Sequence, residues 1–148
     1  MSDQQAAPAW WQEFVAAVPA RTAKAAVTRA DGHPHVTPVW IALDGDGDAT
    51  EILFTTAETS AKGRALRRDA RLSLCWDDER PPFTFVTVFG TARLEDDVDE
   101  VRRWATVIGG RYMGADRAEE YGRRNGVPGE LLVRVTVDRV IAVADVAH

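Results

Sequence analysis

Two neighbouring stretches decide the fold: HPHVTPVW at residues 33–40 and LFTTAETSAKGRALRRDARLSLCW at residues 53–76. Alternating and β-branched side chains predict strands over 33–43, 51–56 and 71–77. Between the last two strands, a polar loop leads into a basic helix that ends near Arg68, with Ser60 as its N-cap. We expect the rest of the chain to support this strand–strand–helix–strand unit.

The flanking segments supply three more strands and three more helices. Strands are predicted over 23–29, 83–94 and 131–144, with Gly90 marking a bulge or bend. Helices are predicted over 9–18, from Asp97 to the stop at Gly109-Gly110, and over 116–125. Six strands joined mainly by turns favour an antiparallel sheet closed into a barrel over a doubly wound parallel sheet. The predicted fold class is therefore mainly β with short helices.

Composition narrows the class of protein. The chain has 148 residues, 45% of them apolar and 28% charged, which suits one globular domain. We expect a disordered tail at residues 1–8 and a single domain over 9–148. The 18 Lys and Arg against 23 Asp and Glu give a net charge of −5, which opposes binding to nucleic acid or an anionic membrane. With one cysteine, no signal peptide and no long apolar run, the protein is expected to be cytoplasmic.

A hydroxyl-rich loop followed by a cationic helix is the composition of an anion site. Hydroxyl and N–H groups at a helix start bind phosphate, and the helix dipole favours negative charge there. Lys62 adds a point charge and Arg64 a planar fork. A solvated charged helix face is the alternative, but this is the only strong cationic focus in an acidic chain. The candidate phosphate-binding residues are Thr55, Thr56, Ser60, Lys62, Gly63 and Arg64.

Pro38 makes the preceding strand unusual. A proline cannot donate to a sheet ladder, so it indicates an edge, a bulge or a backbone that faces a ligand. Aromatic side chains able to stack on a ring, although more often core residues, are Trp40, Trp76, Trp104, Phe83, Phe85 and Tyr112. His33 and His35 share a strand face, but further ligands are missing nearby, so no metal site is predicted.

Four runs carry a family resemblance: TRADGHPHVTPVW at 28–40, LFTTAETSAKGRALRRDARLSLCWDDERPPFTFVTVFGTA at 53–92, GGRYMGADRAEEY at 109–121 and LLVRVTVDRV at 131–140. They resemble the pyridoxamine-5'-phosphate-oxidase-like split barrels, and among these the actinobacterial deazaflavin (coenzyme F420)-dependent reductases. The resemblance implies a six-stranded antiparallel split barrel like that of FMN-binding proteins, and a homodimer with two cofactor sites at its interface.

The resemblance also assigns residues. The cofactor phosphate would be held by the loop and helix of Thr55, Thr56, Ser60, Lys62 and Arg64. The ring would lie along Thr37, Pro38, Val39 and Trp40. The regions of Trp76 and Phe85 would supply contacts from the second subunit.

Three departures favour a deazaflavin over FMN. FMN oxidases of this superfamily usually place Arg before the phosphate Lys, where this chain has Ala61. They carry a Gln where this chain has Phe85. They also end in a Trp/Arg-rich motif, which is absent from residues 131–148.

The sequence therefore predicts an oxidoreductase that moves hydride between bound F420 and a small organic acceptor, with no dedicated catalytic side chain. An FMN oxidoreductase of the same fold is one alternative, and a non-catalytic carrier of flavin, deazaflavin or haem is another. The acceptor, the direction of hydride flow and any role of Arg67, Arg68 and Arg71 in binding a cofactor tail are left open.

Overall fold

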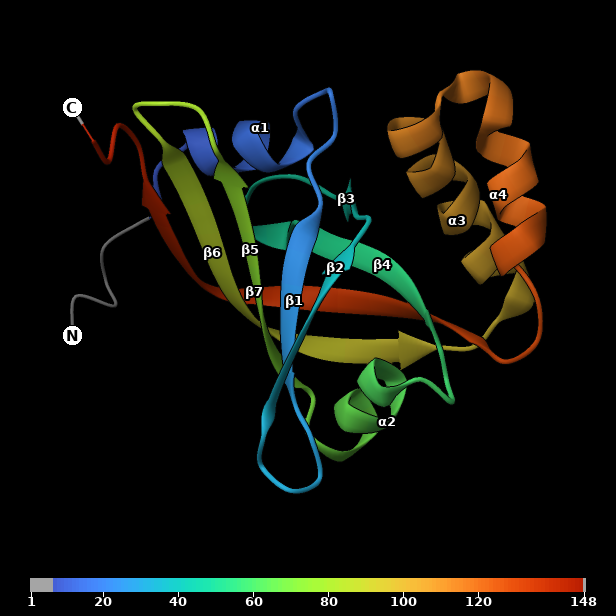
Figure 1. Ribbon diagram of the computed structural model, residues 1–148. Coiled ribbons are helices and arrows are strands. Elements are labelled where there is room, and N and C mark those ends of the chain that lie inside the picture. Colours follow the sequence, from blue (N-terminus) through green and yellow to red (C-terminus); the bar gives the residue numbers. More distant parts are fainter. Residues whose placement is uncertain (1–6, 148) are drawn as a thin grey trace.

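The computed structural model describes residues 7–147, and within them it forms one antiparallel sheet of seven strands with four α-helices around it (Figure 1). The strands are β1 (Ala23–Thr28), β2 (Pro34–Val39), β3 (Ala42–Asp44), β4 (Glu51–Ala57), β5 (Arg71–Asp78), β6 (Thr84–Glu95) and β7 (Glu130–Val143). The helices are α1 (Trp10–Ala16), α2 (Ala61–Arg68), α3 (Val98–Met113) and α4 (Ala118–Asn125), with short 3-10 turns η2 (Gly47–Ala49) and η3 (Ala115–Arg117).

The mainly β class is confirmed, but the prediction of six strands in a closed barrel is wrong. The sheet order is β2-β1-β5-β6-β7-β4-β3, so β2 and β3 are its two ends and do not pair with each other. The strand predicted over 33–43 is broken at Trp40 and Ile41. Val39 pairs with Ala23, where β1 begins, so β1 offers no partner beyond this point. The chain crosses to the other end of the sheet, where Ala42 pairs with Leu53 of β4.

β6 and β7 form the long central pair of the sheet. Their register shifts between Phe89 and Gly90, which confirms the bulge predicted at Gly90. A Cβ at Gly90 would lie 2.4 Å from Val135 Cγ1 and 2.6 Å from Thr136 O, so only glycine fits there. The first half of β7 also pairs with β4, and this places β4 beside the candidate site.

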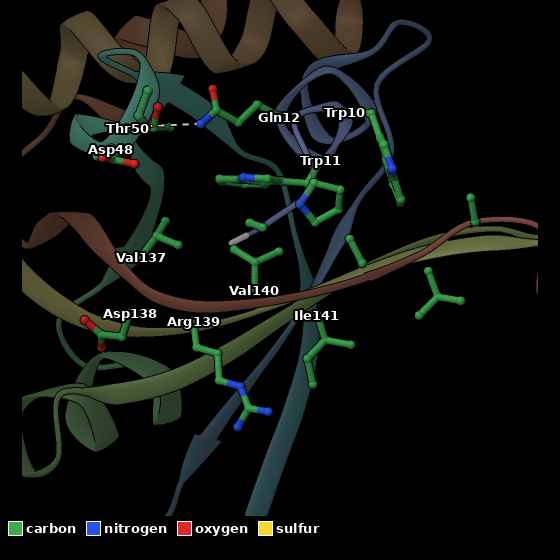
Figure 2. Close-up of a pocket in the computed structure, with 16 residues that line it drawn as sticks. Trp10, Trp11, Gln12, Asp48, Thr50, Val137, Asp138, Arg139, Val140 and Ile141 are labelled. Atoms are coloured by element: carbon green, nitrogen blue, oxygen red, sulfur yellow. Dashed lines mark hydrogen bonds between the residues drawn. The ribbon is translucent and has the colours of Figure 1, made fainter. Parts of the chain in front are cut away.

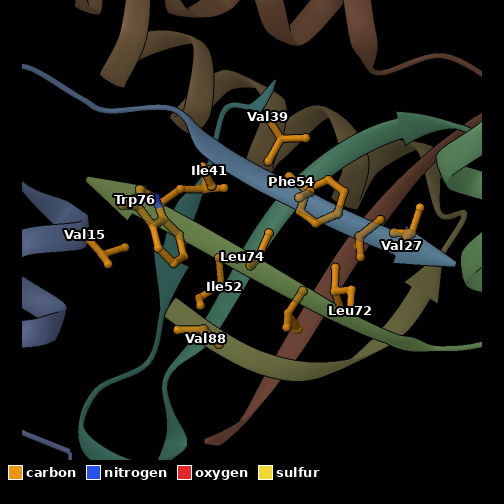
Figure 3. Packing of buried hydrophobic residues seen from close by; sticks show 14 of the residues in the cluster. Val15, Val27, Val39, Ile41, Ile52, Phe54, Leu72, Leu74, Trp76 and Val88 are labelled. Carbon is orange, nitrogen blue, oxygen red and sulfur yellow. The ribbon is translucent and has the colours of Figure 1, made fainter. Parts of the chain in front are cut away.

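The main core lies between the inward faces of the strands (Figure 3). Trp76, Leu74 and Val88 are fully buried there, and Val15 of α1 closes one end. Each such side chain contributes about 1.5–3 kcal/mol through burial. A second cluster joins α3 to the sheet and consists of Ala42, Leu53, Val101, Trp104, Ile108 and Leu132.

α3 begins as the sequence predicts but continues past its predicted end. Asp97 caps it by accepting hydrogen bonds from the N–H groups of Asp99 and Glu100 at 3.0 and 3.4 Å. The prediction that Gly109-Gly110 stops the helix is wrong, because these glycines allow α4 to pack closely against α3. A Cβ on Gly109 would lie 2.5 Å from Tyr121 Cβ. Figure 1 shows the two helices side by side, away from α1 and α2.

Arg134 of β7 holds together the region where β3, β4, β6 and α3 meet. Its side chain is only 9% exposed. Four carboxylates surround it at 2.8–3.3 Å: those of Asp44, Glu51, Glu95 and Glu100. Burial alone lowers the pKa of the Arg134 guanidinium, but hydrogen bonds to Asp44 and Glu95 outweigh burial and raise it. This cluster is a structural ion-pair network.

Residues 1–6 of the predicted tail lie outside the described residues, while Pro8 O accepts a hydrogen bond from Trp11 N at 3.1 Å. Among the helices in the described part of the chain, none has both the length and the apolar character needed to cross a membrane.

Candidate functional site

A pocket of about 310 Å3 lies between the sheet, α2 and the α3–α4 pair. It is lined by Thr22, by Pro38, Val39 and Trp40 around the end of β2, by Thr55 of β4, by Lys62 of α2, and by Ala105, Ile108, Gly109, Tyr121 and Asn125 of α3 and α4. Its volume is at the lower end of the range for small-molecule sites, about 300–1,000 Å3. The pocket therefore suits a ring-sized fragment, with the rest of a larger ligand extending outside.

Lys62 is the only lysine or arginine that lines this pocket, and among the described residues it has no carboxylate partner. Its Nζ donates a 2.6 Å hydrogen bond to Thr37 Oγ1 of β2. The side chain is half-buried, and this burial lowers the pKa of the Lys62 ammonium. A desolvated cation that faces only a hydroxyl group is a position where a bound anion would be stabilised.

The loop before α2 is shaped by Ser60. Its Oγ accepts a hydrogen bond from Gly63 N at 3.0 Å, donates one to Ala57 O at 2.7 Å and shares one with Thr56 Oγ1 at 2.9 Å. The predicted N-cap at Ser60 is confirmed. These three contacts use the whole hydrogen-bonding capacity of the hydroxyl, so Ser60 positions the helix start and has no free donor for a ligand.

Gly63 is needed for the close approach of α2 to β4. A Cβ at this position would lie 2.4 Å from Ala57 O, which is a backbone atom that cannot move aside cheaply. Thr56 is buried beneath the loop, whereas Thr55 lines the pocket. The loop geometry thus aims Lys62 and Thr55 toward one space.

Two aromatic side chains, Trp40 and Tyr121, also line the pocket. The Trp40 ring is stacked on Tyr112, with centroids 5.0 Å apart and planes 3° apart. The ring of Tyr121 is tilted by 59° against Trp40 at 5.6 Å. Contacts with two tyrosines thus fix the Trp40 ring, which lines the pocket as an aromatic wall against which a ligand ring could lie.

The structure brings some predicted site residues together and separates others. Those that line the pocket or contact a residue that lines it are Thr37, Pro38, Val39, Trp40, Thr55 and Lys62. Arg64 is exposed on the outer face of α2. Trp76 is fully buried in the main core of the single chain. Phe85 lies on the outer face of β6, opposite Val143 of β7.

The remaining cations of the basic stretch differ in their surroundings. Arg71 forms a forked pair with Asp69 at 2.8 and 3.0 Å, and Arg67 lies 3.7 Å from Glu58. Arg64 and Arg68, four residues apart on the exposed face of α2, have no carboxylate partner within residues 7–147.

Sequence reasoning missed the part of the pocket that α3 and α4 supply. The sequence pattern singles out none of Ile108, Tyr121 and Asn125 as a site residue. Helical spacing predicts that such residues face the interior, but the pairing of α3 with α4 decides what they face. No group of three or more His, Cys, Asp or Glu side chains in the described part of the chain is arranged to hold a metal ion.

A larger groove of about 980 Å3 runs between α1, η2 and the second half of β7 (Figure 2). Trp10, Trp11 and Gln12 form one side of it, and Val137 to Ala144 form the other. None of the predicted site residues lines this groove. We assign the candidate site to the smaller pocket, because that pocket combines an unpaired cation with an aromatic wall.

Comparisons with known proteins agree with this architecture. The chain matches the family model described as Pyridoxamine 5'-phosphate oxidase over residues 11–144. No curated protein gives a significant match.

Solved structures of the same fold were also found. The conserved hypothetical protein Rv2991 from Mycobacterium tuberculosis is 27% identical, with a TM-score of 0.77 over 93% of this chain and 84% of its own. A protein named F420 reductase is 19% identical, with a TM-score of 0.70 over 91% of this chain and 98% of its own. Atu2129 from Agrobacterium tumefaciens, of unknown function, is 23% identical, with a TM-score of 0.66 over 86% of this chain and 52% of its own.

Proposed function

The chain belongs to the pyridoxamine 5'-phosphate oxidase family, and on this basis we propose that it is an oxidoreductase that binds coenzyme F420 beside Lys62 and acts on a small organic acceptor. The unpaired, half-buried Lys62 is the observation that carries the proposal. The fold of a protein named F420 reductase, similar over 91% of this chain, supports the choice of cofactor.

The residues of the pocket fit such a group. Lys62 would hold the phosphate, together with the N–H groups at the start of α2. Gly63 N and Arg64 N are already bonded to Ser60, so the earlier N–H groups of Ala61 and Lys62 are the ones that face outward. Trp40 would lie against the ring. Thr55 of β4, which lines the same pocket as Lys62, would hydrogen-bond the part of the ligand that joins ring and phosphate.

When bound, a deazaflavin supplies two-electron hydride chemistry, because carbon replaces the flavin N5. The chain's own contribution would be binding and orientation. Ile108 and Ala105 of α3, both buried, exclude water from one side of the pocket. The amide of Asn125 offers a neutral donor and acceptor at the α4 end. Among the described residues, neither a carboxylate nor a histidine lines the pocket, so we expect water to supply the proton that accompanies the hydride.

FMN is the second candidate cofactor, because the sequence also resembles FMN-binding split barrels. FMN also presents a phosphate to Lys62 and a flat ring to Trp40. The absence of an arginine at Ala61 and of a glutamine at Phe85 favours F420. Side-by-side titration with both cofactors tests the choice, and a bound cofactor that no acceptor reoxidises would instead indicate a carrier.

We further propose that the protein is a homodimer that uses the outer face of β6 and β7. Phe89, Ile141 and Val143 are each 37% exposed on this face. Phe85 pairs with Val143, and Ile141 lies beside them opposite Thr87, so Phe85, Ile141 and Val143 form an apolar patch on this face. Light scattering on Ile141→Asp should give a monomer, while Val127→Asp, at a 40% exposed site in the loop after α4, should leave the dimer intact. A monomeric wild-type chain would contradict the proposal.

A further inference from the structure

Ile41, at the break between β2 and β3, has a buried backbone that no strand can satisfy. The residue is fully buried, and it lies outside both strands. A buried N–H or C=O group without a partner costs about 1–3 kcal/mol. Side chains from α3, some 70 residues later in the chain, provide both partners.

Tyr112 and Arg111 hold the backbone of Ile41 at its N–H group and its C=O group, respectively. Ile41 N donates to Tyr112 Oη at 3.1 Å, and Arg111 Nη1 donates to Ile41 O. The Tyr112 hydroxyl also donates to Arg21 O at 2.7 Å. Tyr112 thus links three segments: the end of α3, the residues before β1 and the β2–β3 break.

Two of these segments carry pocket residues at the adjoining positions. Thr22 follows Arg21, and Trp40 precedes Ile41, and both line the pocket. The ring of Tyr112 is stacked on Trp40 with their planes only 3° apart. One side chain therefore fixes the backbone next to two pocket residues, Thr22 and Trp40, and the ring plane of Trp40, although Tyr112 does not itself line the pocket.

We propose that Tyr112, assisted by Arg111, is a positioning residue that sets the plane of Trp40 and thereby determines the affinity of the pocket for a flat ring. The inference rests on the proposed function for the identity of the ring. The hydroxyl is suited to this task because a tyrosine keeps its donor proton at neutral pH, and burial raises the pKa of Tyr112 further. A phenylalanine would keep the stack and lose both hydrogen bonds.

Binding of two separate probes tests the proposal. The phosphate-free ribityl deazaflavin chromophore reports on the ring wall, and inorganic phosphate reports on Lys62. Tyr112→Phe should weaken chromophore binding about 5- to 10-fold and change phosphate binding less than about twofold. Lys62→Ala should show the reverse pattern. Arg111→Met should show the same pattern of affinities as Tyr112→Phe. The control variant Thr91→Val loses a 2.6 Å hydroxyl contact to Asp138 away from the pocket, and it should bind both probes normally.

Nuclear magnetic resonance tests the positioning without any ligand. In Tyr112→Phe the Ile41 amide should exchange faster, and the Trp40 indole N–H signal, assigned with Trp40→Phe, should shift. If the Ile41 amide exchange rate and the Trp40 signal are both unchanged in Tyr112→Phe, the positioning role is overturned. It is also overturned if this variant loses affinity equally for the chromophore and for inorganic phosphate. A wild-type chain that binds neither F420 nor FMN would overturn the proposed function and the effect on ring affinity, and the resonance data would still decide whether Tyr112 positions Trp40.

Discussion

Lys62 Nζ lies 2.6 Å from Thr37 Oγ1, which joins α2 to the end of β2 across 25 residues of sequence. This contact brings the proposed phosphate-binding cation to the edge of the proposed ring-binding strand. Among the described residues, no carboxylate neutralises that cation. The pocket beside it therefore has both an electrostatic and a stacking reason to bind a phosphorylated ring.

Alkaline pH should weaken binding of a phosphorylated cofactor. Because burial lowers the pKa of Lys62, the empty protein loses this charge at a lower pH than an ordinary lysine does. Titrations of FMN or F420 from neutral to alkaline pH should show affinity falling through that window. The cofactor affinity of Lys62→Arg, whose guanidinium stays charged, should not change over the same pH range. A wild-type affinity that does not change would contradict this role for Lys62.

Lys62 should also affect stability, but with the opposite pH dependence: the unfolding free energy should rise with pH where cofactor affinity falls. Between the lowered pKa and the usual lysine value, the unfolded chain binds more protons at Lys62 than the folded chain. The contribution of Lys62 to unfolding free energy therefore rises with pH across this window and is lowest below it. A bound anion restores the folded pKa, so this slope should shrink when inorganic phosphate is present.

Trp76→Phe should lower the unfolding free energy by about 1–2 kcal/mol, because it removes volume from a fully packed core. Its Nε1 has no hydrogen-bond partner in the described part of the chain, so no such bond is lost. Ring affinity should stay the same. Trp40→Phe should do the opposite, with a small stability change and weaker ring binding. If the two variants weakened ring binding equally, the expected role of the Trp76 region at a subunit interface would regain support.

Arg134→Leu should lower the unfolding free energy by about 2–3 kcal/mol, because four carboxylates would lose their shared cation. Arg93→Leu is the matched control, since Arg93 contacts two of the same carboxylates but is 57% exposed. It should cost less than about 1 kcal/mol. Equal losses in urea denaturation would show that the burial of Arg134 is irrelevant.

Gly109→Ala should loosen the α3–α4 pair. The new Cβ would lie 2.5 Å from Tyr121 Cβ, so Tyr121 must move, which lowers the unfolding free energy by about 1–3 kcal/mol. The better helix propensity of alanine offsets about 1 kcal/mol of this loss. Gly110→Ala meets only Ala118 Cβ at 3.2 Å and should be near neutral. Since Tyr121 contacts Trp40, ring affinity should fall in the first variant only. Identical thermal melts and affinities for the two variants would contradict this packing.

Local signals in the sequence predicted much of the fold. The Ser60 cap and the Gly90 bulge both occur where residue chemistry requires them. The break after Val39 could not be predicted, because it depends on where β1 begins. The run through Gly109-Gly110 could not be predicted either, because glycine normally ends a helix unless another helix must approach closely.

The candidate site was predicted on its α2 side and missed on its α3–α4 side. Lys62 and Thr37 carry signals in their local sequence, namely a cationic helix start and an unusual proline-containing strand. Tyr121 and Asn125 have no such signal, since only the contact between α3 and α4 turns them toward the pocket. Tyr112 was expected as a core aromatic, and its two backbone contacts depend on the same nonlocal packing.

The most direct test of the account is a side-by-side titration of F420 and FMN against the wild-type chain, Lys62→Ala and Lys24→Ala. Lys24 is the chain's other lysine and lies outside the pocket, near Asp77. The account predicts that wild type and Lys24→Ala bind F420 more tightly than FMN, and that Lys62→Ala loses about 10- to 100-fold in affinity for both. Unchanged binding by Lys62→Ala, or equal losses in the two lysine variants, would contradict the central claim.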